Sequence, residues 1–309
     1  MKAPLKVVLV AAIAGAAAAF PFFAGPYFLS VALIILVYMS LAVSWDMLLR
    51  SGQISFGIAG FFGLGAYAAA LVDLHLHVPP LLSILCGGIA STLIALALAL
   101  LVLRLRGMYF AIVTLALAQI FQVVIRNWSS LSGGPEGQTL PTVIFGGNSA
   151  SLYWLMLATA AVAVVCSELF ERTRIRFALT TIRDNEIVAQ ARGVNVLGYL
   201  TLAFVVTAAI QGLVGGAYVQ VYGFVTPDGS FSIDFTLLPL AMALLGGVYR
   251  TSGPVVGALV LGVISEYLRL YVPYGSELVY GIIVIVIVLF RPRGIMVSLR
   301  AKARKARVP

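Results

Sequence analysis

The chain has 309 residues, of which 61% are hydrophobic and only 10% are charged. A soluble domain carries roughly 25% charged residues because its surface must face water, so this composition excludes a soluble enzyme. A bilayer crossing needs about 20 apolar residues. The chain is therefore predicted to be an all-α, polytopic helical membrane protein. In such a protein the positions of the basic residues, which give the net charge of +9, indicate which loops lie in the cytoplasm.

Apolar stretches between turn and charge signals predict about ten transmembrane helices. They cover residues 7–25, 28–48, 54–72, 79–103, 107–125, 151–169, 196–222, 235–249, 254–272 and 277–291. The stretch 235–249 is short for a crossing, so it is either a short span or a re-entrant segment. Residues 1–25 have two readings, a secretory signal or a retained helix, and the length of the apolar run favours the helix.

The basic residues fix the predicted orientation. If the amino terminus is cytoplasmic, all of the 20 Lys and Arg residues except Arg126 and Arg269 fall on the cytoplasmic side. This is the positive-inside pattern, and with an even number of spans it places both termini in the cytoplasm. Residues 1–291 then form a single transmembrane domain, and residues 292–309 form a basic cytoplasmic tail beside anionic lipid.

No catalytic constellation stands out in the sequence. The chain contains no Gly-Lys dipeptide and hence no Walker A loop for nucleotide phosphates. His75 and His77 share a short loop without further ligands, which favours a solvated turn over a metal site. Carboxylates near the middle of a span, which an ion-driven carrier is expected to use, are scarce. The sequence therefore predicts a protein that is not an enzyme, binds no cofactor or metal, and takes its energy from elsewhere.

The most informative polar segment is 171–195, ERTRIRFALTTIRDNEIVAQARGVN, on the predicted cytoplasmic side. Ile182, Ile187, Ala189 and Ala191 give it an imperfect apolar stripe among charges. Asp184 or Asn185 is a candidate cap for a short helix that ends at Gly193. By physics alone, such a helix either lies on lipid or docks a soluble partner.

The segment from Ile182 to Asn195 resembles the cytoplasmic coupling loop of permeases in ATP-binding-cassette importers, and the whole chain resembles the M-type permease subunit of branched-chain amino-acid importers. Seven further matches run in family order over residues 50–295. They are Gly52-Gln53-Ile54-Ser55 with Phe61-Phe62-Gly63, Arg104-Leu105-Arg106-Gly107, Gly133-Gly134, Leu245-Gly246-Gly247, Gly253-Pro254, Gly257-Ala258 and Arg291-Pro292-Arg293-Gly294.

The resemblance implies a division of labour among subunits. A related permease would form a heterodimer with this chain, two cytoplasmic ATPases would bind ATP and Mg, and an extracytoplasmic binding protein would land on the loops 126–150 and 223–235. The implied ATPase-docking residues are Ile182, Arg183, Asp184, Asn185, Glu186, Ala189 and Gly193. The implied location is the bacterial cytoplasmic (inner) membrane.

Small and polar residues supply two further predictions. The pairs Ala59 and Gly63, Gly212 and Gly216, and Gly253 and Gly257 each place small residues one turn apart, which lets helices approach closely in lipid. Gln53 and Ser55, at the start of the third span, either line the solute pathway on irregular backbone or cap the helix. Ile58 is a third pathway candidate because the family commonly has His there, and Tyr249 stands where the family has Gly.

The sequence thus predicts a permease subunit of an ATP-driven importer that moves branched-chain or related amino acids by alternating access. The alternative is a self-sufficient secondary carrier or channel for small apolar solutes. Within the same importer architecture, urea, short amides and aromatic acids remain open as cargo, because the binding protein is expected to set most of the selectivity.

Overall fold

The computed structural model describes residues 15–141, 144–271 and 281–282. Within them, seven helices are long and apolar enough to cross a membrane. They are α2 (Pro26–Leu49), α3 (Ile58–Leu76), α4 (Pro80–Val102), α5 (Met108–Asn127), α7 (Ser149–Arg172), α10 (Val196–Tyr222) and the combined segment Pro227–Gly246 formed by α11 (Pro227–Ser230) and α12 (Asp234–Gly246). The all-α, polytopic prediction is confirmed.

The remaining elements are short, apart from α13 (Ser252–Tyr271), whose apolar part is Ser252–Leu268. They are α6 (Ser129–Ser132), α8 (Arg174–Asp184), α9 (Glu186–Ala191), the 3-10 turns η1 (Phe20–Phe22), η2 (Gly134–Glu136) and η3 (Ile144–Gly147), and the strands β1 (Gln138–Thr139) and β2 (Phe224–Val225). Of the ten predicted spans, 277–291 lies outside the described residues except for 281–282. Only residues 15–25 of the span 7–25 are described.

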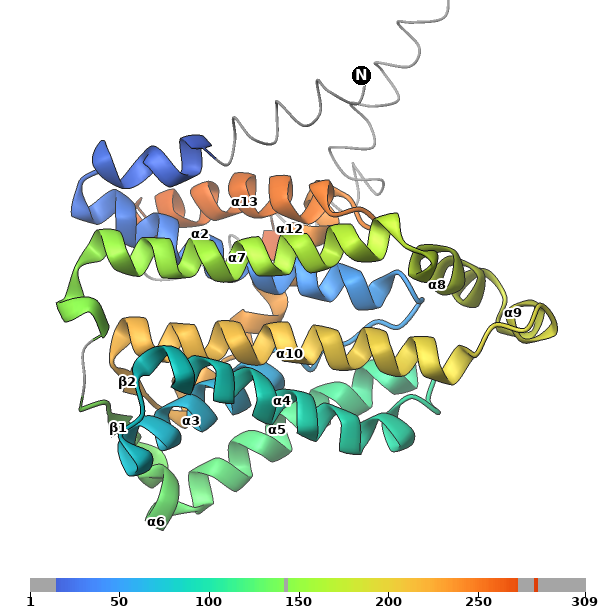
Figure 1. Ribbon diagram of the computed structural model, residues 1–309, viewed down its shortest axis with the longest axis horizontal. Coiled ribbons are helices and arrows are strands. Elements are labelled where there is room, and N and C mark those ends of the chain that lie inside the picture. Colours follow the sequence, from blue (N-terminus) through green and yellow to red (C-terminus); the bar gives the residue numbers. More distant parts are fainter. Residues whose placement is uncertain (1–14, 142–143, 272–280, 283–309) are drawn as a thin grey trace, which may run out of the picture.

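Helix α10 lies at the centre of the bundle (Figure 1). On one side it packs against α3 and α4, and on the other against α2, which in turn contacts α7, α12 and α13. Helix α5 lies at the edge and contacts mainly α3. The ends that carry Arg50, Arg104, Arg106 and Arg172 gather on one side of the bundle, together with α8 and α9. We call this side the basic end.

Glycines allow α3, α4 and α10 to approach at backbone distance. A Cβ on Gly65 would collide with the carbonyl oxygen of Gly212, and one on Gly87 would lie 2.5 Å from the carbonyl oxygen of Gly65. Of the predicted packing residues, Gly212 faces Ser91, and Gly216 lies against Ile84. In lipid, where apolar side chains gain little by leaving hydrocarbon, such close packing holds helices together.

The other predicted packing residues lie on α3 and α13. A Cβ on Gly63 would lie 2.6 Å from the ring of Phe231. Gly253 and Gly257 pack against backbone of α12 and the turn that follows it, where a Cβ on either would collide with a carbonyl oxygen. Ala59 is buried, and its N–H donates to the Thr236 hydroxyl at 3.2 Å.

The segment predicted as a short or re-entrant span at 235–249 is the later part of a longer crossing of the bundle. Asp228, seven residues before it, contacts Arg126 at the end opposite the basic end, and Tyr249 contacts Asp46 at the basic end. The crossing starts at Pro227, earlier than predicted, and residues 231–233 interrupt it between α11 and α12. Hydropathy did not predict this first turn, because the sequence around Asp228 is polar.

The third span also differs from its prediction, because α3 begins at Ile58 instead of residue 54. Residues 50–57 are non-helical and fold back along the bundle. The Trp45 indole donates to the Ser55 carbonyl oxygen at 2.8 Å, and the Phe56 N–H donates to the Thr114 hydroxyl on α5 at 3.0 Å. These contacts satisfy backbone groups that would otherwise be exposed to hydrocarbon.

Candidate functional site

The segment 171–195 forms two helices at the basic end, α8 and α9, where the sequence predicted one (Figure 1). Asn185 has extended backbone, ends α8 and caps α9, since its Oδ1 accepts the Val188 N–H at 3.1 Å. Gly193 follows α9 with φ +78°, a conformation that glycine adopts without strain. Of the two predicted caps, the structure selects Asn185 over Asp184.

The apolar side chains of this segment do not form one face, because some point into the bundle and others point outward. Ile182 and Ala189 are buried against the rest of the chain. Ile187 is 78% exposed and Val188 is 40% exposed on α9. Helix α8 is therefore held to the bundle by its inner face, while α9 presents aliphatic side chains outward.

An ion pair joins the start of α9 to the loop between α4 and α5. The Arg106 guanidinium donates to both carboxylate oxygens of Glu186, at 2.7 and 2.8 Å. This hydrogen-bonded guanidinium holds the pKa of Glu186 below its usual range. Because a two-pronged pair also fixes orientation, this contact sets how the start of α9 sits against the α4–α5 connection.

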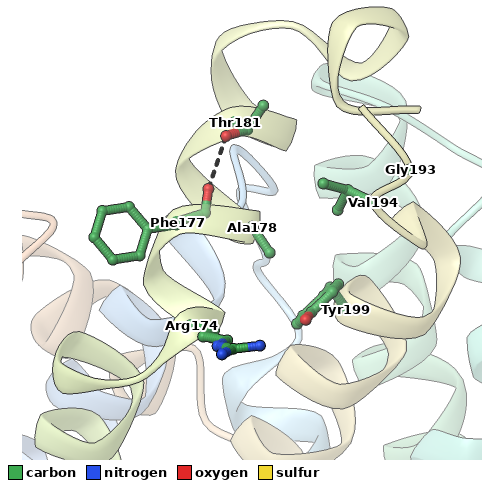
Figure 2. A pocket seen from close by; sticks show the side chains of 7 residues that line it. All are labelled: Arg174, Phe177, Ala178, Thr181, Gly193, Val194 and Tyr199. Carbon is green, nitrogen blue, oxygen red and sulfur yellow. Dashed lines mark hydrogen bonds between the residues drawn. The ribbon is translucent and has the colours of Figure 1, made fainter. Parts of the chain in front are cut away.

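A cleft of about 330 Å³ separates α8 from the first turns of α10 (Figure 2). Ala178 and Val194 form its apolar walls, with Gly193 at its edge, and the Arg174 side chain extends toward Tyr199. The Phe177 ring points away from the cleft. Helix α8 thus leaves open space beside the start of α10.

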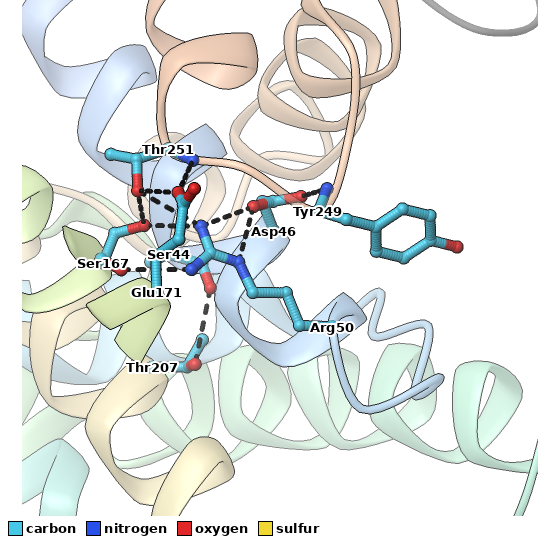
Figure 3. A network of polar contacts seen from close by, with 8 residues as sticks. All are labelled: Ser44, Asp46, Arg50, Ser167, Glu171, Thr207, Tyr249 and Thr251. Carbon is cyan, nitrogen blue, oxygen red and sulfur yellow. Dashed lines mark hydrogen bonds and ion pairs between the residues drawn. The ribbon is translucent and has the colours of Figure 1, made fainter. Parts of the chain in front are cut away.

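A buried polar network lies where α2, α7 and the α12–α13 turn meet at the basic end (Figure 3). The Arg50 guanidinium pairs with the Asp46 carboxylate at 2.9 Å, and the two side chains are only 6% and 0% exposed. Arg50 also donates to the Ser167 hydroxyl at 2.7 Å and to the Ser167 carbonyl oxygen at 3.0 Å. A charge this deeply buried is tolerated because it is paired and hydrogen-bonded.

The α12–α13 turn completes the network. The N–H of Thr251 donates to the Glu171 carboxylate at 3.2 Å, and the hydroxyls of Thr251 and Ser167 lie 2.8 Å apart. The Tyr249 N–H donates to Asp46 Oδ1 at 2.5 Å. Helices α2 and α7 and the α12–α13 turn therefore share one set of polar contacts.

Tyr249 also links this network to the segment 171–195. It has φ +70°, a left-handed conformation unusual for a tyrosine, and its ring lies 4.2 Å from the Arg183 guanidinium carbon. Arg183 is the penultimate residue of α8. One residue thus contacts the last turn of α8 through its ring and the buried ion pair through its backbone.

The predicted pathway residues Gln53, Ser55 and Ile58 are all buried inside the chain. Gln53 donates to the Leu105 carbonyl oxygen at 3.3 Å, while its Oε1 has no partner among the described residues. Ser55 Oγ accepts the N–H of Gly57, which is the N-cap of α3. No side chain caps α3, so the predicted cap is absent. Gln53 and Ser55 lie instead on the folded-back segment 50–57, and Ile58 is the first residue of α3.

The two loops predicted to receive a binding protein contact each other at the end opposite the basic end. Gln138 pairs with Val225 and Thr139 with Phe224 in a short antiparallel ladder. Asp228, from the second loop, also pairs with Arg126. The loops between α5 and α7 and between α10 and α12 therefore form one connected surface.

Metal-ligating side chains are scattered over the described part of the chain, which holds no group of three His, Cys, Asp or Glu residues close enough to bind an ion. His75 contacts the Leu71 carbonyl oxygen of its own helix at 3.0 Å.

A family model described as "Branched-chain amino acid transport system / permease component" matches residues 27–290. The chain belongs to this permease family. It is similar to the high-affinity branched-chain amino acid permease protein LivM of Salmonella typhimurium, at 26% identity over 93% of this chain and 74% of the relative. LivM of Escherichia coli is 27% identical over the same shares. A probable LivH permease of Methanocaldococcus jannaschii is 26% identical over 75% of this chain and 79% of the relative. No solved structure matches the chain.

Sequence reasoning missed most of this permease's polar network. Asp46 and Arg50 stand four residues apart at the end of a predicted span, and this spacing was the available signal for a helical ion pair. No local signal pointed to Ser167, Glu171 or Thr251, whose partners are 80 to 201 residues away in sequence.

Proposed function

We propose that this permease is the transmembrane subunit of an ATP-driven importer that moves branched-chain or related amino acids by alternating access. The observation that carries the proposal is the connection from α9 and α8 at the basic end into the buried Asp46–Arg50 network, through the Arg183–Tyr249 contact. A soluble ATPase subunit that binds α9 would thereby act on several spans at once.

The orientation follows from charge. The basic end carries most of the described arginines, and basic loops stay on the cytoplasmic side of the membrane. Segment 171–195 would then face the cytoplasm, and the paired loops of β1 and β2 would face the exterior. Both termini would be cytoplasmic in a bacterial inner membrane.

The proposed coupling step is a rigid-body movement. An ATPase subunit would bind the outward aliphatic side of α9, which includes Ile187. Its displacement would reach the α4–α5 connection through Arg106–Glu186 and the α2, α7 and α12–α13 contacts through Arg183–Tyr249. The permease itself does no covalent chemistry.

The other subunits follow from the same reasoning. ATP and Mg would bind to two separate ATPase subunits, because the chain has no Gly-Lys dipeptide with which to form a Walker A loop. The match to both LivM and LivH relatives supports a heterodimer with a related permease. A substrate-binding protein would land on the exterior surface made by the two paired loops.

Two substitutions in the segment 171–195 test the coupling assignment. Glu186→Lys places two cations face to face at Arg106, and Gly193→Leu forces a branched side chain into left-handed backbone. Both variants should insert into the membrane normally but lose the link between ATP hydrolysis and uptake in the reconstituted importer. Gly193→Asn is the matched control, because Asn tolerates this backbone conformation. Unchanged uptake in Glu186→Lys and Gly193→Leu would remove the docking assignment.

A further inference from the structure

Helix α5 is the least buried of the seven described spans, with only 22% of its apolar window buried. One exposed face of α5 is apolar along the span, with Ile120, Val123 and Val124, and ends at the exposed Asn127. Such a face suits contact with lipid. A different face of the same helix carries polar groups, and these require another explanation.

The polar face consists of Gln119, Gln122 and Arg126, at helical spacings of three and four residues. Gln119 and Arg126 are exposed, and Gln122 is half-buried. Helix α4 offers a comparison, because its large exposed side chains are aliphatic throughout: Leu81, Leu82, Leu85, Ile89, Leu93, Leu96, Leu100 and Leu101. The polar face of α5 is therefore not a general feature of the outer helices.

Depth makes Gln119 the decisive residue. It lies eight residues before the end of α5 at Asn127, which corresponds to about 12 Å along the helix axis. Among the described spans, it is the one exposed amide or charged side chain that lies two turns or more from both ends of its helix. An amide facing hydrocarbon loses its hydrogen bonds to water without compensation, so water, solute or protein must cover this face.

The polar face continues to the exterior end of α5. Asp228 accepts a hydrogen bond from the Gln122 amide at 3.0 Å and pairs with Arg126 at 3.3 Å. The Arg126 and Asp228 side chains are 50% and 62% exposed. On the other half of α5, the exposed residues on the same face as Gln119 are the apolar Met108 and Ile112, with Tyr109 exposed beside them. The polar track thus starts at the exterior and stops near the middle of the span.

We propose that the exterior half of α5 lines the solute pathway of this permease, and that the pathway takes a zwitterionic amino acid. Arg126 would receive the carboxylate of the solute and Asp228 its ammonium group, while Gln122 and Gln119 offer hydrogen bonds further in. An exposed ion pair is weak, so the solute exchanges for it at little cost. This inference rests on the proposed function for the identity of the solute and for the side of the membrane, whereas the polar track itself is carried by the side chains of α5.

Cysteine accessibility tests the track. In the full-length protein expressed in its native host, with Cys86 and Cys166 replaced by Ala, Gln119→Cys and Ile120→Cys are treated from outside with a charged, membrane-impermeant methanethiosulfonate. A thiol reacts as its thiolate, which needs water, so Gln119→Cys should react at least about ten-fold faster than Ile120→Cys. Equal rates, fast or slow, would overturn the proposal. Slow reaction at both positions would mean that lipid or a second permease covers this face.

Uptake tests the role of the ion pair. In the complete importer, Arg126→Gln should lower leucine uptake at limiting concentration by about ten-fold, the equivalent of one charge-assisted contact. Asn127→Ala, at the neighbouring exposed position, should stay within about two-fold. Uptake by Arg126→Gln equal to that of the parent protein would remove the pair from the pathway. Because labelling at Gln119→Cys needs no ATP hydrolysis, failure of the track and failure of the ATP-driven mechanism give different results.

Discussion

Two ion pairs with the same spacing on their helices provide a direct comparison of buried and exposed electrostatics. Asp46 and Arg50 on α2 are 0% and 6% exposed, whereas Glu168 and Arg172 on α7 are 40% and 78% exposed. Both pairs lie at the basic end and both join an acid to an arginine four residues later. Replacing each arginine by Met removes the charge and keeps an unbranched side chain.

The structure predicts very different costs for the two substitutions. Arg50→Met leaves the Asp46 carboxylate buried beside the Tyr249 N–H alone and removes both donors to Ser167. Breaking a buried pair in this way costs about 3–5 kcal/mol of unfolding free energy. Arg172→Met removes an exposed pair and should cost roughly 0–0.5 kcal/mol. The expected difference in melting temperature is on the order of 10 °C.

Thermal unfolding of the two variants in the same lipid and detergent mixture measures this difference. The double variant with Asp46→Asn and Arg50→Met should recover part of the loss, because the uncompensated charge is gone. Equal melting temperatures for Arg50→Met and Arg172→Met would refute the assignment of the network as a buried joint between helices.

Three further predictions concern single contacts. Gly87→Ala should destabilise the protein by about 1–3 kcal/mol, because its Cβ would lie 2.5 Å from a carbonyl oxygen. At the neighbouring Gly88 the nearest atom would be 3.4 Å away, so Gly88→Ala should be neutral or stabilising by up to about 1 kcal/mol, and thermal unfolding of the two variants measures the difference. Arg106 lowers the pKa of Glu186, so the pair contributes its full stability above the ordinary carboxyl pKa and loses it as the pH falls through the lowered pKa. The difference in melting temperature between the parent protein and Glu186→Gln should therefore vanish in acid, and a difference that persists there would contradict the assignment. Tyr249→Gly keeps the backbone N–H that donates to Asp46 and removes the strain of the left-handed conformation, so the free energy of unfolding should change by less than about 1 kcal/mol. A larger loss would mean that the ring contributes more than a cation–π contact.

The spans could be predicted from sequence wherever the helix boundaries are set locally. The predicted range 196–222 coincides with α10, and the Pro at residue 26 marks the start of α2. The short helix near Glu186 was also predictable, because an Asn cap and a Gly terminator are local signals. These elements needed no knowledge of the rest of the fold.

The errors lie where distant contacts decide the conformation. Residues 54–57 are non-helical because Ser55 and Phe56 hydrogen-bond to α2 and α5. The crossing that begins at Pro227 is divided at 231–233, where Phe231 packs against Gly63. Neither contact has a signature in the local sequence, and the same holds for the ladder that joins β1 to β2.

The polar face of α5 shows a different limit. Gln119 and Gln122 are visible in the sequence, but hydropathy averages them with their aliphatic neighbours. Their importance depends on which face of the helix remains uncovered, and that is decided by packing against α3. Exposure at depth is a property of the assembled bundle.

In the proposed mechanism, separate ATPases drive this permease through the segment 171–195. The most direct test is leucine uptake into proteoliposomes that contain the permease with its partner permease and its binding protein, measured with an imposed ion gradient and then with the ATPase subunits and ATP. We expect no accumulation under the gradient and concentrative uptake once ATP is hydrolysed. Accumulation driven by the gradient without the ATPases would show a self-sufficient carrier and contradict the account.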